Sequence, residues 1–279
     1  MGQYQQGTFF GEGETELYYQ SWFPSVPPRA ILVIIHGLGG HSGLFNNIID
    51  HLVAENYGVF AYDLRGHGHS QGQRGYIKNW AELRGDLQAF LSLIKQQYSH
   101  CSCFLWGHSL GSIIVLDYVM KYPEQVQGAI IVAAPLGEVG VSPLKIQIGK
   151  ILSRFWPSFT LETGIELGAG SRDPKVLDAY SNDPLRHTQA TARLANEFFL
   201  TVAWIKSHIY QLKIPLLFLQ GGADRISLPD GVRLFFEQVA WQDKQLIIYP
   251  QAYHELHNDL NYLEVIKDLI FWLDKHLCD

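Results

Sequence analysis

A serine between two glycines is the pattern in this sequence that most directly suggests chemistry. Residues 107–111 read Gly-His-Ser-Leu-Gly, between an apolar run and a second apolar run of helical spacing. Because glycine has no Cβ, Gly107 and Gly111 allow a sharp turn from strand to helix that holds the middle residue in a strained conformation. Such a turn exposes the Ser109 hydroxyl and aims the first N–H groups of the helix at its target. The pattern also occurs by chance, so it needs a base and an acid elsewhere in the chain.

An aspartate and a histidine that each follow a late strand are the expected partners of this serine. A serine hydroxyl needs a base within hydrogen-bond reach, and the base needs an anion that orients it. Asp224 follows the apolar run 214–220, and His254 follows the run 244–249. The order serine, aspartate, histidine along the chain is the order known for this kind of nucleophile turn. We therefore predict a catalytic triad of Ser109, His254 and Asp224.

Other acidic and histidine side chains compete for these roles. Asp230 lies next to an expected helix start, where capping the helix is the simpler role. His257 lies on the approach to the last helix, a short distance beyond the preferred base. His67 and His69 belong to a glycine-rich loop after a different strand, and we expect them in that loop or at its rim.

Two main-chain N–H groups are needed to stabilise the oxyanion formed in acyl transfer. Leu110 follows the serine and opens the expected helix, so its N–H is one candidate. The other is expected in the turn after the run 30–35, where residues 36–40 read His-Gly-Leu-Gly-Gly and Leu38 is the candidate. A plain tight turn is the alternative role of these glycines. A phosphate-binding loop is not expected, because no Gly-Lys-Ser/Thr sequence follows.

The apolar segments that must position these residues predict an open, mostly parallel sheet covered by helices on both faces. Residues 7–23 predict an antiparallel hairpin, after which continuous apolar runs alternate with helical patterns. Ligands of such folds bind at the carboxyl ends of the strands, where His36, Asp63 and Ser109 fall. The expected helices cover residues 44–55, 80–97, 112–121, 231–239 and 261–277.

The alternation stops between residues 136 and 207. Helical patterns cover residues 143–156, a piece near 174–180, and 185–208. We predict that residues 136–207 are a helical cap inserted after the sixth strand, and that residues 1–135 and 208–279 form one catalytic domain.

Composition narrows the choice of partners. The chain has 279 residues and a formal net charge of −6, which argues against nucleic acid as a partner. The start of the sequence has neither the basic residues nor the apolar core of a signal peptide, and no apolar run is long enough to span a bilayer. Cys101, Cys103 and Cys278 are an odd number without metal-ligand spacing. We therefore expect a cytoplasmic protein without a cofactor or metal; the sequence does not indicate the oligomeric state.

Several motifs together resemble the monoacylglycerol lipase and lysophospholipase branch of the α/β hydrolases. The resemblance rests on residues 36–42 (His-Gly-Leu-Gly-Gly-His-Ser), 63–70 (Asp-Leu-Arg-Gly-His-Gly-His-Ser), 107–111, 182–185 (Asn-Asp-Pro-Leu), 221–224 (Gly-Gly-Ala-Asp) and 253–255 (Tyr-His-Glu), which occur in the right order over nearly the whole chain. It implies an α/β-hydrolase fold, the same triad, an oxyanion hole at Leu38 and Leu110, and a cap that forms an acyl tunnel. One departure is Gly40, where relatives often carry glutamate; this affects the detail of the loop and not the reacting groups.

The expected activity is therefore the hydrolysis of single-chain lipid esters, such as monoacylglycerol to glycerol and fatty acid, through an acyl-enzyme. A lysophospholipase, a small-ester carboxylesterase and a non-catalytic ligand-binding protein are the alternatives.

The first helix of the cap has an apolar face and a basic face. It either packs on the catalytic domain or rests on a membrane interface, and the second possibility would add a peripheral membrane contact to the cytoplasmic location. The apolar face comprises Leu144, Ile148, Ile151, Leu152 and Phe155. The residues that would line an acyl tunnel, or else pack inside the cap, are Trp156, Phe159, Phe198, Phe199, Leu200 and Trp204.

Overall fold

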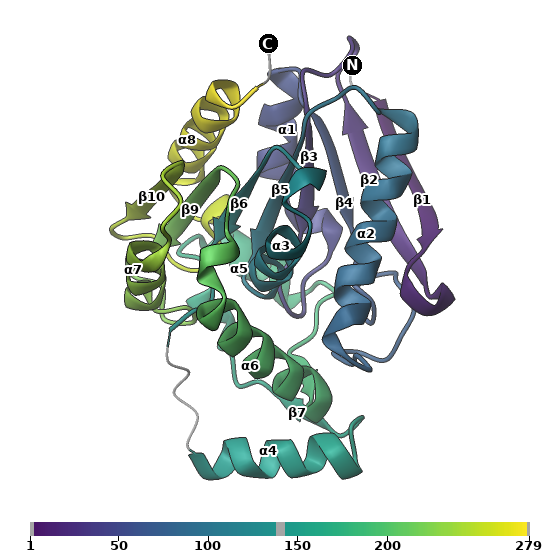
Figure 1. Ribbon diagram of the computed structural model, residues 1–279, viewed down its shortest axis with the longest axis vertical. Helices are drawn as coiled ribbons and strands as arrows, with labels where there is room; N and C mark the ends of the chain where they lie inside the picture. The colour runs from purple at the N-terminus through teal and green to yellow at the C-terminus, as the bar shows by residue number, and fades with distance from the viewer. Residues whose placement is uncertain (1–2, 138–142, 278–279) are drawn as a thin grey trace.

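Eight strands form one sheet through the middle of the molecule (Figure 1). The computed structural model describes residues 3–137 and 143–277. The strand order is β1-β2-β4-β3-β5-β6-β9-β10; β1 pairs antiparallel with β2 and β2 with β4, and the remaining neighbours are parallel. The strands are β1 (Gln3–Phe10), β2 (Glu16–Phe23), β3 (Ile31–Ile35), β4 (Gly58–Tyr62), β5 (Cys103–His108), β6 (Gly128–Val132), β9 (Leu216–Gly221) and β10 (Lys244–Tyr249). The predicted hairpin and the mostly parallel sheet are confirmed.

Helices cover both faces of this sheet, because successive side chains of a strand point to opposite faces. In β3, Ile31 and Val33 belong to the apolar cluster on the face covered by α2, α3 and α7, whereas Leu32 and Ile34 belong to the cluster on the face covered by α1 and α8. The covering helices are α1 (Asn46–Ala54), α2 (Trp80–Gln97), α3 (Leu110–Lys121), α7 (Pro229–Gln238) and α8 (Tyr262–Lys275). Every residue of β3, β4 and β6 is buried, which is why these strands read as continuous apolar runs.

The segment between β6 and β9 forms the helical cap. It contains α4 (Pro143–Phe155), β7 (Thr160–Glu162), α5 (Pro174–Ser181), β8 (Gln189–Thr191) and α6 (Ala192–Ser207). Figure 1 shows α4 as the element farthest from the central sheet, with α6 running between them. The side chains of Leu144 and Lys145 lie outside the described residues.

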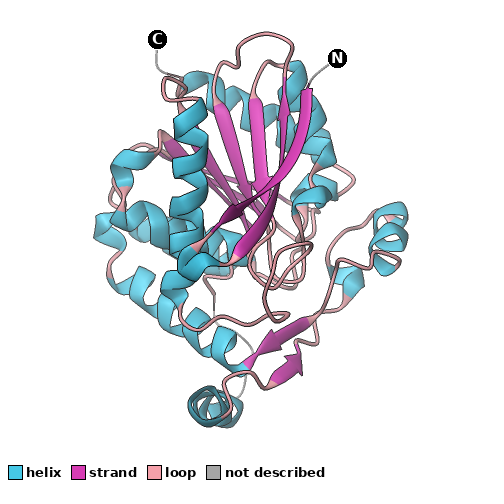
Figure 2. Cartoon of the chain, turned by 90° about the vertical axis from the view of Figure 1, so that its right-hand side faces the viewer, coloured by secondary structure: helices cyan, strands magenta, loops and turns pink. Residues whose placement is uncertain are grey.

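The prediction of one helix over residues 185–208 was wrong in its first part. Residues 189–191 form β8, which pairs with β7 in a small antiparallel sheet (Figure 2), and α6 begins only at Ala192. The Thr191 side chain accepts a hydrogen bond from Leu194 N, which caps the helix at this point. Its own N–H and hydroxyl both donate to the Gly75 carbonyl. Strands of three residues are too short to give a periodic signal in the sequence.

Two further findings concern membranes and cysteines. None of the helices in the described ranges is long and apolar enough to cross a membrane. Cys101 and Cys103 are free thiols at the start of β5, and Cys278 lies outside the described residues.

Candidate active site

Ser109 occupies a strained turn between β5 and α3. Its φ of 53° and ψ of −117° are values that side-chain-bearing residues rarely adopt. A Cβ on Gly107 would lie 2.5 Å from the Gly111 carbonyl oxygen, and a Cβ on Gly111 would lie 2.1 Å from that of Ile35. Only glycine fits at both positions. The turn expected from the sequence is therefore present, and its serine is half-buried at the carboxyl end of the sheet.

Asp224 and His254 form a buried hydrogen-bonded pair at the ends of β9 and β10. His254 Nδ1 lies 2.8 Å from Asp224 Oδ2. The other carboxylate oxygen accepts from the N–H groups of Ile226 and Ser227 at 2.8 and 2.9 Å, which fixes the acid in the loop after β9. Because the carboxylate accepts hydrogen bonds, it places the imidazole proton on Nδ1 and leaves Nε2 as the free, basic nitrogen. Asp230 lies in the first turn of α7 with an exposed side chain, away from this pair.

His108 connects the serine turn to the loop of His254. Its ring lies 4.9 Å from the His254 ring, and its Nε2 donates to the His254 carbonyl at 3.3 Å. Burial, with smaller contributions from His254 and His257, lowers the pKa of His108 well below its usual range, so this ring is neutral. Within the described residues the Ser109 hydroxyl has no hydrogen-bond partner. Catalytic hydrogen bonds are often long in a free enzyme and shorten when substrate binds.

The loop after β3 lies directly against the serine. A Cβ on Gly37 would be 3.1 Å from the Ser109 Cβ, and Gly40 N–H closes the turn by donating to the Gly37 carbonyl at 3.1 Å. Leu38 and Gly39 lie between these two residues. Leu110 is the first residue of α3, so its N–H lacks a carbonyl partner inside the helix and is available to a ligand.

His36 holds this loop in place, a role that the sequence pattern did not reveal. Its Nε2 accepts from Leu64 N–H at 2.9 Å, so the proton is on Nδ1, which donates to the Gly37 carbonyl at 2.7 Å. Burial lowers the pKa of His36 to about 3, so the ring stays neutral and keeps this arrangement. The only sequence signal is a His-Gly pair at the end of a buried strand.

Asp63 joins the same loop to the glycine-rich loop after β4. Its two oxygens accept from Ser42 N–H at 2.7 Å and from His69 N–H at 2.8 Å. His69 is exposed, as expected for a rim residue. His67 also lies in this loop, as expected, but its side chain is buried between the rings of His36 and His187 at 5.3 and 4.6 Å.

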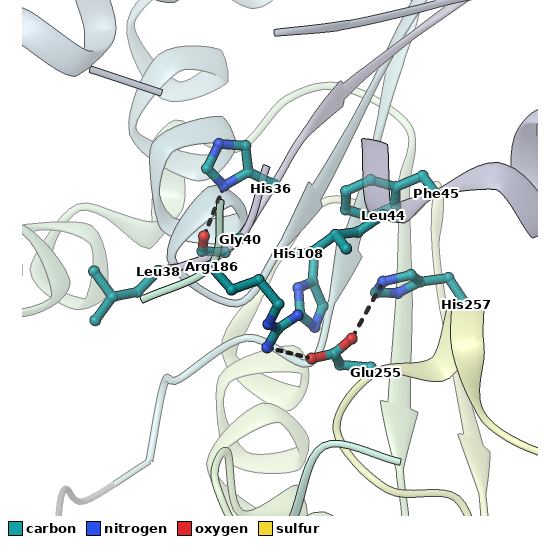
Figure 3. Close-up of a pocket in the computed structure, with 10 residues that line it drawn as sticks. His36, Leu38, Gly40, Leu44, Phe45, His108, Arg186, Glu255 and His257 are labelled. Carbon is teal, nitrogen blue, oxygen red and sulfur yellow. Dashed lines mark hydrogen bonds and ion pairs between the residues drawn. The ribbon is translucent and has the colours of Figure 1, made fainter. Parts of the chain in front are cut away.

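A cavity of about 20 Å³ is lined by the loop after β3 and by His108, the residue before the serine (Figure 3). That volume holds about one water molecule. Arg186, Glu255 and His257 form its polar side, with Glu255 3.4 Å from Arg186 and 3.8 Å from His257. Burial lowers the pKa of His257 to about 4, partly opposed by the Glu255 carboxylate, and its ring stacks on Phe45 at 4.4 Å. His257 is therefore a neutral residue of the cavity wall, and His254 is the histidine that pairs with Asp224.

A larger hollow of about 310 Å³ lies between α2, α3 and α6, at the end of α3 remote from Ser109. Lys121 Nζ lies 3.3 Å above the Trp204 ring there. Trp204 therefore lines an outer groove and is also partly buried against the hydrophobic core, as the packing alternative predicts. Among the described residues, no group of three or more histidine, cysteine, aspartate or glutamate side chains is arranged to hold a metal ion, although several histidines lie close together.

Comparison with known proteins places this geometry in a family. The family model described as serine aminopeptidase, S33, matches residues 26–261. The chain is 30% identical over 273 residues to a monoacylglycerol lipase of Mycolicibacterium smegmatis, covering 97% of both chains. It is 31% identical over 267 residues to the monoglyceride lipase of Mus musculus, covering 94% of this chain and 88% of the mouse protein.

A solved structure gives the same result for the fold. The monoacylglycerol lipase of Paleococcus ferrophilus superposes with a TM-score of 0.86 at 30% identity, covering 93% of this chain and 99% of that one. The chain therefore has the α/β-hydrolase fold with a helical cap and belongs to the serine aminopeptidase S33 family of hydrolases, as a monoacylglycerol lipase-like member.

Proposed function

We propose that this protein is a serine hydrolase of carboxylic esters, and that its substrates are monoacylglycerols or similar single-chain lipid esters. The observation that carries the proposal is the pairing of a strained, half-buried Ser109 with a buried His254–Asp224 hydrogen bond at the same edge of the sheet. Its relatives include proteins named monoacylglycerol lipase and monoglyceride lipase. A purely ligand-binding protein would not need this strained turn.

In the proposed reaction His254 Nε2 removes the hydroxyl proton while the Ser109 oxygen attacks the ester carbonyl. Asp224 keeps the proton on Nδ1 and stabilises the imidazolium that forms. The N–H groups of Leu38 and Leu110 stabilise the tetrahedral oxyanion, and the loss of one such donor costs about 3–4 kcal/mol in related cases. The imidazolium then protonates the leaving alcohol. Water, activated by the same nitrogen, releases the fatty acid.

The cap supports the choice of a lipid substrate. Ile151 and Phe155 on α4 are 57% and 77% exposed, and Lys150 and Arg154 of the same helix are also exposed. Exposed apolar and basic residues on one helix favour contact with a lipid surface, from which a single-chain ester would enter. We propose residues 136–207 as the unit that controls this entry, and residues 1–135 and 208–279 as the catalytic unit.

The test is a chain-length series of p-nitrophenyl esters and monoacylglycerols, with lysophospholipids as competing substrates. We expect kcat/KM to rise with acyl length and to be highest for monoacylglycerol, and Ser109→Ala to abolish turnover while circular dichroism is unchanged. Highest activity on acetate would favour a small-ester carboxylesterase, and highest activity on lysophospholipid a lysophospholipase. Undiminished activity of Ser109→Ala would show that the nucleophile is wrong.

A further inference from the structure

One short segment of the cap, residues 183–187, contacts both loops of the candidate active site. The first contact is with the loop after β3, which carries Leu38. Asp183 Oδ2 lies 2.8 Å from His41 Nε2, and the His187 N–H donates to the Gly39 carbonyl at 3.2 Å. Gly39 has a φ of +71°, and a Cβ at this position would lie 1.8 Å from the His187 carbonyl oxygen. Cap and loop therefore meet backbone to backbone, with no space for a side chain between them.

The second contact is with the loop that carries His254. Arg186 lies 3.4 Å from the carboxylate of Glu255, the residue directly after the proposed base (Figure 3). The other oxygen of Glu255 accepts from the Tyr180 hydroxyl of α5, and the Arg186 guanidinium lies 3.8 Å above the Tyr180 ring. Glu255 and Tyr180 are both buried. A buried carboxylate with these partners is held firmly, because an unpaired one would cost several kcal/mol.

The segment also holds its own shape. The second oxygen of Asp183 accepts from Leu185 N–H at 2.9 Å, and Pro184 fixes the backbone between them. The His41 ring is held in one orientation too, since its Nδ1 accepts from Gly43 N–H at 3.2 Å and its Nε2 therefore donates to Asp183. Asp183 and Arg186 must then move together, because the turn between them is closed.

We propose that residues 183–187 position the catalytic loops: Asp183 holds the oxyanion loop through His41, and Arg186 holds the loop of the base through Glu255. Neither side chain touches the reacting atoms in this account, so both are positioning residues. The inference rests on the proposed function. It adds that the cap takes part in assembling the catalytic centre, because any shift of this segment moves the N–H donor and the base together. A misplacement of about 1 Å in such a centre can cost about 100-fold in rate.

The test uses p-nitrophenyl acetate, a substrate too short to depend on an acyl tunnel. We expect Asp183→Ala and Arg186→Met each to lower kcat about tenfold with KM changed less than about twofold, because alignment and not binding is lost. Arg186→Lys should recover part of the loss by keeping the charge opposite Glu255. His41→Ala should act like Asp183→Ala, and the double variant should be no slower than either single variant, as expected for one shared interaction.

Two matched controls separate this role from general damage to the cap. Asp178→Ala on α5 and Lys206→Met on α6 remove the same charges at exposed positions of the cap and should keep kcat at the value of the unaltered protein. If Asp183→Ala and Arg186→Met also keep kcat within twofold while their thermal unfolding midpoints fall, the contacts are structural only and the inference is wrong. Additive losses in the His41 and Asp183 variants would refute the pairing. If the unaltered protein neither hydrolyses the ester nor reacts with a fluorophosphonate at Ser109, the proposed function fails and this inference fails with it.

Discussion

The two halves of the cap are attached to the rest of the molecule in different ways. The first half, represented by α4, packs against α6 and leaves Ile148, Ile151 and Phe155 exposed to solvent. The second half, around α5 and the segment 183–187, is joined to the catalytic domain by buried ionic and hydrogen-bonded contacts. Arg172, for example, donates from its Nε to both oxygens of the buried Asp259, at 3.1 and 3.0 Å.

This difference indicates that the two halves of the cap have different functions. Apolar contacts are non-directional, so a helix that offers mainly apolar side chains can adapt to a lipid surface or a variable acyl chain. Paired buried charges with satisfied hydrogen bonds are costly to rearrange, so they fix a geometry. We infer that α4 controls how the substrate reaches the site. The second half of the cap aligns the catalytic groups at the strand ends.

The largest effect on kcat is expected from a change of the proposed catalytic acid, which lies at the strand ends beneath the second half of the cap. Asp224→Asn should lower kcat about 10⁴-fold, because the amide leaves the His254 imidazole in the wrong tautomer while the geometry is kept. Steady-state hydrolysis of p-nitrophenyl butyrate measures this. Asp230→Asn, the matched change on the exposed start of α7, should have no effect. Equal losses in both variants would show that the acid has been assigned wrongly.

An effect of intermediate size is expected from a change in α4, and it should affect binding to lipid only. Phe155→Glu should weaken binding to phosphatidylcholine–phosphatidylglycerol vesicles about tenfold or more, because burial of a phenylalanine is worth about 2 kcal/mol. Hydrolysis of p-nitrophenyl acetate should not change. Gln147→Glu adds the same charge at an exposed position of the same helix and should affect vesicle binding much less. Vesicle co-sedimentation that is equal for all three proteins would refute the proposed membrane contact.

The smallest expected effect is on the free energy of unfolding at acidic pH. It comes from buried histidines around the strand ends, whereas α4 contains no histidine. Burial lowers the pKa of five histidines, among them His257 to about 4 from an ordinary value of 6.5. Above pH 6.5 these rings are neutral in the folded and the unfolded chain and contribute nothing to the pH dependence. Below pH 6.5 only the unfolded chain takes up the protons, so the free energy of unfolding falls, by about 1.4 kcal/mol per pH unit for each histidine, until the folded-state pKa is reached. The other four histidines are His36, His67, His108 and His187.

Urea unfolding at several pH values between 6.5 and 4 measures this slope. His257→Gln removes one of the five groups and should make the slope shallower, whereas His100→Gln, at an exposed position, should leave it unchanged. A slope that is the same in all three proteins would show that His257 is protonated in the folded state.

The central sheet could be predicted well from the sequence because burial on both faces leaves a direct trace. Runs such as residues 31–35 have no polar residue, and helical patterns follow them in the sequence. The start of α3 was expected at Ser112 and lies at Leu110, since the turn at the serine is tighter than periodicity alone indicates. The cap was harder to predict because β7 and β8 are three residues long and pair with each other across α5.

The three proposed catalytic residues could also be predicted from the sequence. Ser109, Asp224 and His254 each lie within about five residues of the end of a strand, so the topology alone brings them to one edge of the sheet. The roles of His36 and Arg186 could not be predicted. They depend on which carbonyl or carboxylate lies opposite a side chain, and that is decided by contacts between segments far apart in the sequence.

The most direct test of the account is to identify the residue that a fluorophosphonate modifies. After reaction with a desthiobiotin fluorophosphonate and digestion, mass spectrometry should find one phosphonylated residue, Ser109. Labelling should disappear in Ser109→Ala and slow strongly in Asp224→Asn. Modification of a different residue, or undiminished labelling of Ser109→Ala, would contradict the assignment of this serine as the nucleophile.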